Sequence, residues 1–241
     1  IYRLAREGMR FDRAYVGNSI CAPSRATLLT GKHSHMNGKY DNRDSFNHDQ
    51  QQFQKILQKH GYQTAMIGKW HLGTDPTGFN HWDVLPGQGS YYNPAFIDTS
   101  GQYFMEGYTT EIIGEKTIQW LEKVKDSGKP FMVMMHHKAP HRAWDPGPNE
   151  LGMYKEVEFP EPATLFEDYS GRGEGERNNR MSIAFSMRLG RDLKINPESI
   201  PVPNASPIFG GQELNEEQLG KWLGLYERVN AEFQDLNPTG E

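Results

Sequence analysis

The chain has little cysteine, no long apolar run and no excess of positive charge. Its single cysteine excludes an internal disulfide framework and a zinc site built from several cysteines. The longest strand-like apolar run covers only residues 131–135, far short of the roughly 18 residues that suggest a membrane-spanning helix. The net charge is −5 and no cluster of lysine or arginine stands out, whereas nucleic-acid-binding domains carry a basic footprint. We therefore expect neither a membrane span nor a nucleic-acid partner.

The length and composition are those of an ordinary globular chain. With 241 residues, 36 % apolar and 24 % charged, it can form one large α/β domain or a piece of a larger one. It opens on Ile1, in what looks like the middle of an element, with no initiator methionine and no recognisable signal peptide. We expect both ends to be cuts, so the missing signal carries no information about location.

Helix and strand patterns alternate up to about residue 144. Period-two alternation and short apolar runs predict strands, and apolar residues at helical spacing predict helices. Strands that alternate with helices indicate the α/β class, with functional residues at strand ends. In chain order, the expected elements are a strand over 9–16, a helix over 24–30, a helix over 53–57 that stops at Gly61, a strand over 62–70, a helix over 113–124 and a strand over 131–135.

The second part of the chain has a different texture. Residues 145–211 contain eight prolines and a stretch rich in glycine and charge, which predicts functional loops or disorder. A last helix follows, with Asn215 as its cap and an apolar stripe over 219–233. We expect a core over 1–144, a loop-rich insertion over 145–211 and a helix within 212–241.

The surroundings of Cys21 suggest chemistry on an anion. Cys21 lies just before the helix expected from Ser24, and the free N–H groups and the dipole of a helix start favour negative charge. Arg25, about one turn further on, could add a guanidinium. The three intervening residues are too few for the phosphate-binding loop of cysteine phosphatases. Taken alone, the pattern also fits a buried cysteine in a strand-to-helix turn.

Two motifs carry a family resemblance. Residues 21–25 (CAPSR), continued by 29–31 (LTG), resemble the signature of the type I sulfatases, in which the cysteine is oxidised to formylglycine. Residues 68–73 (GKWHLG) resemble the next motif of that family. The resemblance implies an alkaline-phosphatase-like fold, in which helices sandwich a mixed sheet. The chain would then be most of the N-terminal catalytic domain, truncated at both ends.

The resemblance also implies a mechanism and roles for residues. A hydrated formylglycine at Cys21 would attack the sulfur of a sulfate ester with one hydroxyl, and the second hydroxyl would allow sulfate to leave. Lys69 would contact the sulfate, beside Arg25, and His71 would contact the formylglycine hydroxyl. Two residues apart at a strand end, Lys69 and His71 should leave the same face of the sheet. Each alone would equally fit a solvated lysine or a capped loop histidine.

A cluster of histidines follows the last predicted strand, in residues 135–142 (MHHKAPHR). Histidine is the usual general acid near neutral pH. By resemblance we predict that His141 protonates the leaving oxygen, with His137 as the next candidate and His136 packed on the other face. Lys138 could add charge at the sulfate or lie at the rim. The spacing matches no standard zinc motif.

Residues 78–94, together with the histidine cluster, resemble the N-acetylglucosamine-6-sulfatase branch, which acts on heparan-type or related sulfated glycans. Trp82, Tyr91 and Tyr92 in this stretch could offer their ring faces to a sugar, or they could pack in a core. The resemblance thus predicts a sulfated carbohydrate substrate, with the 6-sulfate of N-acetylglucosamine as the expected ester.

The resemblance further implies one Ca²⁺, bound by two pairs of acidic or amide side chains and a formylglycine oxygen. Both pairs are expected outside residues 1–241, so Cys21 is the only metal ligand predicted here, and we expect this piece alone to bind Ca²⁺ poorly and to be inactive. The other implied partner is a formylglycine-generating or anaerobic sulfatase-maturating enzyme. The implied location is secreted, periplasmic or lysosomal.

Two alternatives remain open. Phosphonate monoester hydrolases and phosphodiesterases of the same superfamily also carry a formylglycine motif, so the substrate could be a phosphorus ester. The chain could instead be a non-catalytic, glycan-binding relative. The presence of Cys21, Arg25, Lys69 and His71 together argues against that second alternative.

Overall fold

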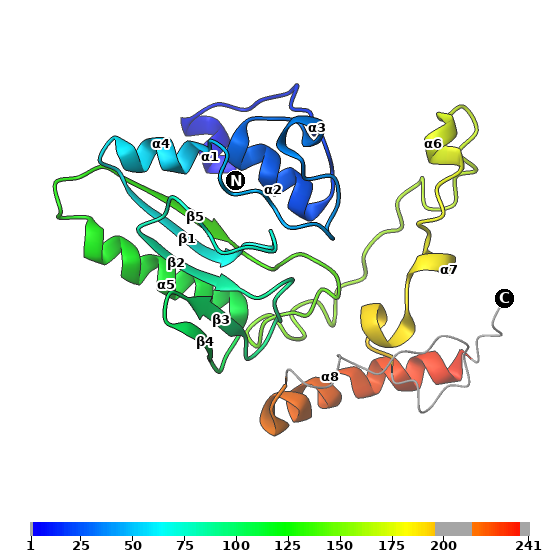
Figure 1. The fold of residues 1–241 in the computed structure, drawn as a ribbon. Coiled ribbons are helices and arrows are strands. Elements are labelled where there is room, and N and C mark those ends of the chain that lie inside the picture. Colours follow the sequence, from blue (N-terminus) through cyan, green and yellow to red (C-terminus); the bar gives the residue numbers. More distant parts are fainter. Residues whose placement is uncertain (1, 196–213, 237–241) are drawn as a thin grey trace. The chain divides into compact units, whose positions relative to one another are not determined.

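The computed structural model describes residues 2–195 and 214–236, and its chain forms two compact units (Figure 1). The first unit comprises Ile1–Gly89, Ala95–Met105 and Glu111–His137, and the second comprises Ser90–Pro94, Glu106–Thr110 and Lys138–Glu241. None of the described helices combines the length and apolar character that crossing a membrane requires.

The first unit contains the sheet. Its elements in chain order are α1 (Tyr2–Glu7), α2 (Cys21–Thr30), α3 (Ser34–Asn37), α4 (Phe53–Lys59), β1 (Gln63–Lys69), β2 (His81–Leu85), β3 (Ala95–Asp98), β4 (Gly101–Phe104), α5 (Thr109–Val124, whose first two residues belong to the second unit) and β5 (Phe131–His136). The strand order is β4-β3-β2-β1-β5. β1 is parallel to β2 and to β5, whereas the β2–β3 and β3–β4 pairs are antiparallel. The sheet is therefore mixed, as predicted.

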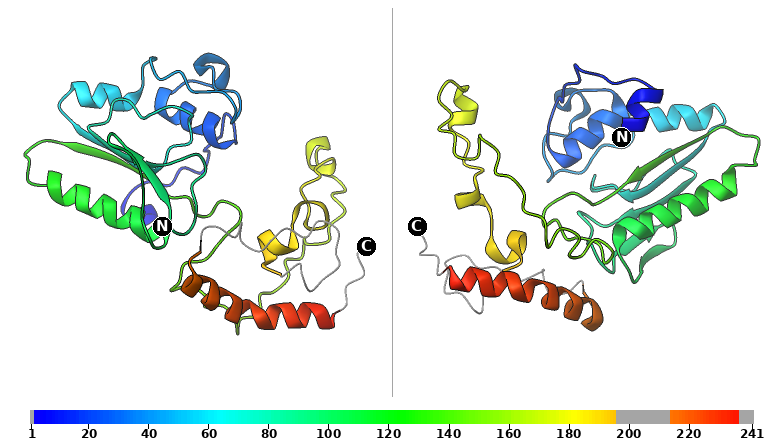
Figure 2. Two further views of the ribbon diagram at one scale, coloured as in Figure 1. Left: turned by 60° about the horizontal axis from the view of Figure 1, so that its bottom comes forward. Right: turned by 180° about the vertical axis from the view of Figure 1, so that it is seen from behind.

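Helices cover both faces of this sheet (Figures 1 and 2). β1 is buried from Thr64 to its end, and its successive side chains enter two different cores. Met66 packs with Ala26 and Leu29 of α2 on one face, and Ile67 packs with Ile113 of α5 on the other. Each large side chain buried in this way contributes about 1.5–3 kcal/mol. The sandwich of helices around a sheet is thereby confirmed.

The predicted strands over 62–70 and 131–135 are confirmed as β1 and β5, but the strand predicted over 9–16 is wrong. That segment is irregular, and its apolar side chains Met9, Phe11 and Tyr15 are each about three-quarters exposed or more (75 %, 74 % and 89 %). Alternation predicts a strand only where a neighbour covers one face, and no described strand pairs with this segment.

The predicted helices are confirmed as α2, α4 and α5, with two differences. The first begins at Cys21 rather than at Ser24, because proline is tolerated in the first turn of a helix. In α4, Phe53 and Ile56 were expected to face the core, yet both are exposed and the buried residue is Gln54. β2, β3 and β4 were not predicted.

The second unit contains the short helices α6 (Glu174–Arg177) and α7 (Ile183–Ser186), the π-helical turn η1 (Leu189–Leu193) and the long helix α8 (Glu216–Asp235). The described part of the predicted loop-rich segment is largely irregular, as expected, and residues 196–211 of it lie outside the described residues. Asn215 caps α8, as predicted: its side chain accepts a hydrogen bond from the Gln218 backbone N–H, and Gln218 reciprocates.

The core of the second unit is aromatic. Tyr91, Tyr92 and Tyr108 pack with Trp222 of α8, and all four are at least nine-tenths buried. The Tyr92 hydroxyl donates to the Pro146 carbonyl oxygen at 2.6 Å. Of the two interpretations of Tyr91 and Tyr92, core packing is the one that the structure supports.

Candidate active site

Cys21 is the first residue of α2 and is partly exposed. At two positions of the helix start, the free N–H groups that the sequence suggested are not available. The Ala22 N–H donates to Asn42 Oδ1 at 3.0 Å, and Pro23 has no N–H. The prediction of free N–H groups is therefore wrong for Ala22 and Pro23.

Arg25 lies one turn into α2 and points into the first unit. Its Nη1 donates to the Lys69 carbonyl oxygen and lies 2.9 Å from His136 Nδ1. Burial lowers the pKa of Arg25, and its electrostatic interaction with Cys21 opposes that shift. Because an arginine stays protonated in proteins, Arg25 is a fixed positive charge one turn after Cys21 in the same helix.

His136 contacts Arg25, which the sequence did not predict. It was expected on the other face, but it ends β5 on the same face as Met134, which packs against the α2 core. Burial, reinforced by the positive charge of Arg25, lowers the pKa of His136 to about 4. The ring is therefore neutral near pH 7. Because a guanidinium can only donate, His136 Nδ1 must accept the hydrogen bond from Arg25.

Lys69 is the last residue of β1, and it is only 3 % exposed. Its ammonium donates to Gln88 Oε1 at 2.5 Å, which compensates part of the cost of burying a charge. Gln88 lies in residues 78–94, where the sequence analysis named three aromatic residues as possible sugar contacts but did not name this amide. The structure thus adds Gln88 to the surroundings of the predicted sulfate-binding lysine.

The direction of the His71 side chain does not follow from strand geometry. β1 stops at Lys69, and His71 adopts a left-handed backbone with φ of 55°, so period-two alternation does not extend to it. The argument that Lys69 and His71 leave the same face of the sheet is therefore wrong as a derivation. His71 is partly buried, and its neighbour Leu72 is part of the α2-side core.

The remaining candidates divide between the units. His137 closes the first unit and is partly buried, and burial lowers its pKa. Lys138 and His141 belong to the second unit. Lys138 is 8 % exposed, with its ammonium 5.0 Å from the centroid of the Tyr91 ring, so it does not lie at an exposed rim.

His141 has a defined ring orientation. Its Nδ1 lies 2.6 Å from the carbonyl oxygen of Arg142, and its own carbonyl oxygen accepts a hydrogen bond from the Tyr91 hydroxyl. Its backbone N–H donates to the Lys138 carbonyl oxygen at 3.0 Å. The structure therefore groups Cys21 with Arg25 in the first unit, and Lys138 with His141 around Tyr91 in the second.

The described side chains do not by themselves form the calcium site that the family resemblance implies. Within residues 2–195 and 214–236, no three His, Cys, Asp or Glu side chains are arranged to hold a metal ion. These residues do not by themselves fit a calcium site, which needs six to eight oxygen ligands.

Comparisons with known proteins agree with the motifs. A family model described as Sulfatase matches residues 1–188. The chain is 45 % identical over 236 residues to an N-acetylglucosamine-6-O-sulfatase of Bacteroides thetaiotaomicron, covering 97 % of this chain and 40 % of that protein. It is 28 % identical over 178 residues to an N-acetylglucosamine-6-sulfatase of Homo sapiens, covering 64 % of this chain and 32 % of that protein.

One solved structure matches the whole chain. It is described as a complex with its substrate D-glucosamine-2-N,6-O-disulfate, and it matches with a TM-score of 0.89 and 44 % identity over 100 % of this chain and 49 % of that chain. The match supports the alkaline-phosphatase-like fold expected from the motifs. The chain spans less than half the length of each of these relatives.

Proposed function

The chain belongs to the sulfatase family, and from this premise we propose that the whole protein hydrolyses sulfate esters of glycans with a formylglycine made from Cys21. The observation that carries the proposal is the arrangement around Cys21. Arg25 lies one turn after Cys21 in α2 and is held by the Lys69 backbone and by His136. A fixed cation beside the nucleophile suits a substrate whose charge is on the sulfate oxygens.

The proposed reaction has two halves. A maturating enzyme, either formylglycine-generating or anaerobic, first oxidises the Cys21 thiol to an aldehyde, which adds water to give two hydroxyls on one carbon. One of these hydroxyls gives up its proton to a base and its oxygen bonds to sulfur, while the bond from sulfur to the sugar oxygen breaks and His141 gives the sugar oxygen a proton. The second hydroxyl then loses its proton, the C=O bond forms again and sulfate leaves.

The other candidates take supporting roles in the proposal. Lys69 and Arg25 contribute charge to the sulfate oxygens, and His71 contacts the formylglycine hydroxyl. His137 is the second candidate for the leaving-group acid, and Lys138 is a second candidate for contact with the sulfate. These roles are supported by the sulfatase motifs at residues 21–31 and 68–73, and by the burial of both lysines beside polar or aromatic partners.

The proposed substrate is the 6-sulfate of N-acetylglucosamine in a sulfated glycan. Two findings support it: the bacterial relative at 45 % identity is named an N-acetylglucosamine-6-O-sulfatase, and the matched structure holds a glucosamine that carries a 6-O-sulfate. We further propose that the whole protein uses Ca²⁺, with formylglycine at Cys21 as one ligand and the other ligands outside the described residues. A secreted, periplasmic or lysosomal location accords with such a substrate.

The direct test is sulfate release by the full-length protein, produced together with a maturating enzyme. We expect release from N-acetylglucosamine 6-sulfate by the wild type and none above background by Cys21→Ala. Activity only on galactose or uronic acid sulfates would overturn the substrate and leave the sulfatase proposal intact. Faster turnover of a phosphodiester than of an aryl sulfate would favour the phosphorus alternative, and glycan binding without turnover would favour a binding protein.

A further inference from the structure

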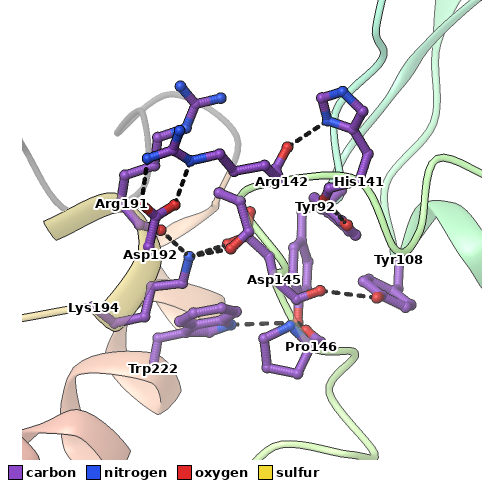
Figure 3. Close-up of polar contacts among 12 residues, drawn as sticks. Tyr92, Tyr108, His141, Arg142, Asp145, Pro146, Arg191, Asp192, Lys194 and Trp222 are labelled. Atoms are coloured by element: carbon purple, nitrogen blue, oxygen red, sulfur yellow. Dashed lines mark hydrogen bonds and ion pairs between the residues drawn. The ribbon is translucent and has the colours of Figure 1, made fainter. Parts of the chain in front are cut away.

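The ring of His141 is held in one tautomer. Its Nδ1 lies 2.6 Å from the Arg142 carbonyl oxygen, and a carbonyl can only accept, so Nδ1 carries a hydrogen (Figure 3). When the ring is protonated, Nε2 carries the second hydrogen. Nε2 is therefore the atom that can give up a proton without breaking the bond to Arg142.

The Arg142 side chain is clamped by a buried carboxylate of η1. Arg142 Nε donates to Asp192 Oδ1 at 2.6 Å, and Nη2 donates to Asp192 Oδ2 (Figure 3). Nη2 also donates to the Ser186 carbonyl oxygen at 2.7 Å. The Asp192 side chain is fully buried (0 % exposed), and its Oδ2 also accepts from the Arg188 N–H at 2.7 Å. Burial works to raise the pKa of Asp192, but the hydrogen bonds from Arg142 and from the Arg188 N–H, together with the charges of Arg142 and Arg191, outweigh it and lower the pKa. This is a two-pronged, charge-assisted pair, the strongest side-chain arrangement of its kind.

A second ion pair secures the same segment from the residue that follows η1. Lys194 Nζ lies 2.5 Å from Asp145 Oδ1 and donates to the carbonyl oxygens of Ala143 at 2.9 Å and Arg191 at 2.6 Å. The Lys194 side chain is 3 % exposed and lies 5.8 Å from the centroid of the Trp222 ring. Residues 142–145, directly after His141, are thus held twice by residues 192–194.

Resting on the proposed function, we infer that Asp192 is a positioning residue for His141. Through Arg142 it fixes the carbonyl oxygen that receives the Nδ1 hydrogen, and so it keeps Nε2 as the proton donor to the leaving sugar oxygen. Asp192 itself touches neither the substrate nor the reacting atoms. It lies 51 positions after His141 in a segment that no sulfatase motif marks.

The test compares two sulfate esters that differ in their leaving group. A sugar alcohol leaves only if it is protonated, whereas 4-nitrophenolate leaves without help, so a misplaced acid harms the first substrate and spares the second. In the full-length, matured protein, we expect Asp192→Asn to slow sulfate release from N-acetylglucosamine 6-sulfate by about 10- to 100-fold. Release from 4-nitrophenyl sulfate should fall by less than about 3-fold, and the alkaline limb of the pH–rate profile for the sugar sulfate should shift.

Matched variants complete the design. Glu217→Gln removes an exposed carboxylate that pairs with Lys221 on α8, and it should change neither rate. Asp192→Glu restores the charge and should recover part of the sugar-sulfate rate. If Asp192→Asn fails to fold, Arg142→Lys keeps the positive charge, loses the two-pronged pair and should show the same substrate dependence. An equal loss on both substrates, or no loss on either, would overturn the inference. A wild type that is inactive on both substrates would instead refute the proposed function.

Discussion

The hydrogen bond between Arg25 and His136 gives a quantitative prediction. In His136→Leu, a side chain of comparable bulk removes the only acceptor that His136 offers, so the guanidinium keeps the Lys69 carbonyl and loses its 2.9 Å partner. A hydrogen bond to a charged group contributes about 1.5–3 kcal/mol. At 1.36 kcal/mol per tenfold, the loss corresponds to roughly a 10- to 150-fold fall in kcat/KM if Arg25 acts on the sulfate.

The assay is sulfate release by the full-length, matured protein, with inorganic sulfate as a competitive inhibitor. We expect His136→Leu to weaken inhibition by sulfate as well as kcat/KM, because Arg25 would bind sulfate in both cases. His136→Asn is the matched control, since its side-chain oxygen can stand where Nδ1 stands and should restore most of both. Equal losses in the two variants, or an undiminished rate in His136→Leu, would refute the reasoning.

The same residue predicts a pH dependence of stability. The pKa of His136 is lowered to about 4 in the folded protein, below the ordinary value of 6.5, by burial and by Arg25. As pH falls from about 6.5 to about 4, the unfolded chain takes up a proton that the folded protein rejects, so stability is progressively lost. The full shift corresponds to at most about 3 kcal/mol, and less because the ring is partly exposed. Across this pH window, the free energy of unfolding measured in urea should fall by up to that amount more in the wild type than in His136→Leu. Equal falls in the two proteins would contradict the account.

Two further predictions concern the sheet. Gly68→Ala would place a Cβ 2.0 Å from the His136 carbonyl oxygen at a φ of 99°, so it should destabilise the protein by roughly 2 kcal/mol or more. The control Gly61→Ala also has a positive φ, 85°, but its Cβ would meet open space, so it should destabilise the protein less. Equal urea midpoints for the two variants would contradict this prediction. Lys116→Met would leave the buried Asp83 carboxylate, which lies 2.7 Å from the Lys116 ammonium, without its cation. The free energy of unfolding measured in urea should therefore fall by about 3–5 kcal/mol. A fall of less than about 1 kcal/mol would contradict this prediction.

Much of the fold could be predicted because the decisive patterns are local. β5 is an apolar run, β1 has a short apolar stretch at residues 65–67, α5 has a clear helical stripe, and Asn215 caps α8 through side-chain chemistry that the sequence displays. The strand predicted over 9–16 failed for the opposite reason, since alternation shows what a strand could bury and not whether a neighbour exists to cover it. The three strands from His81 to Phe104 are too short, at four or five residues each, to give a clear period.

The sequence predicts candidate site residues mainly where a sulfatase motif contains them. Cys21, Arg25 and Lys69 were predicted from the motifs, but the side chains that contact Arg25 and Lys69 come from distant positions. His136 was misplaced because β5 is an almost unbroken apolar run, so the sequence did not show which of its faces meets α2. Asp192 carried no signal at all, because a buried aspartate in a loop-rich segment looks the same as a solvated one until its arginine is known.

The most direct test of the central claim is a mass spectrum of the peptide that contains Cys21, taken from full-length protein produced in a host with a maturating enzyme. The account predicts that Cys21 has lost its sulfur and reacts as an aldehyde, for example with a hydrazine reagent, in the same preparation that releases sulfate. An unmodified thiol at Cys21 in a preparation that turns over sulfate esters would contradict it.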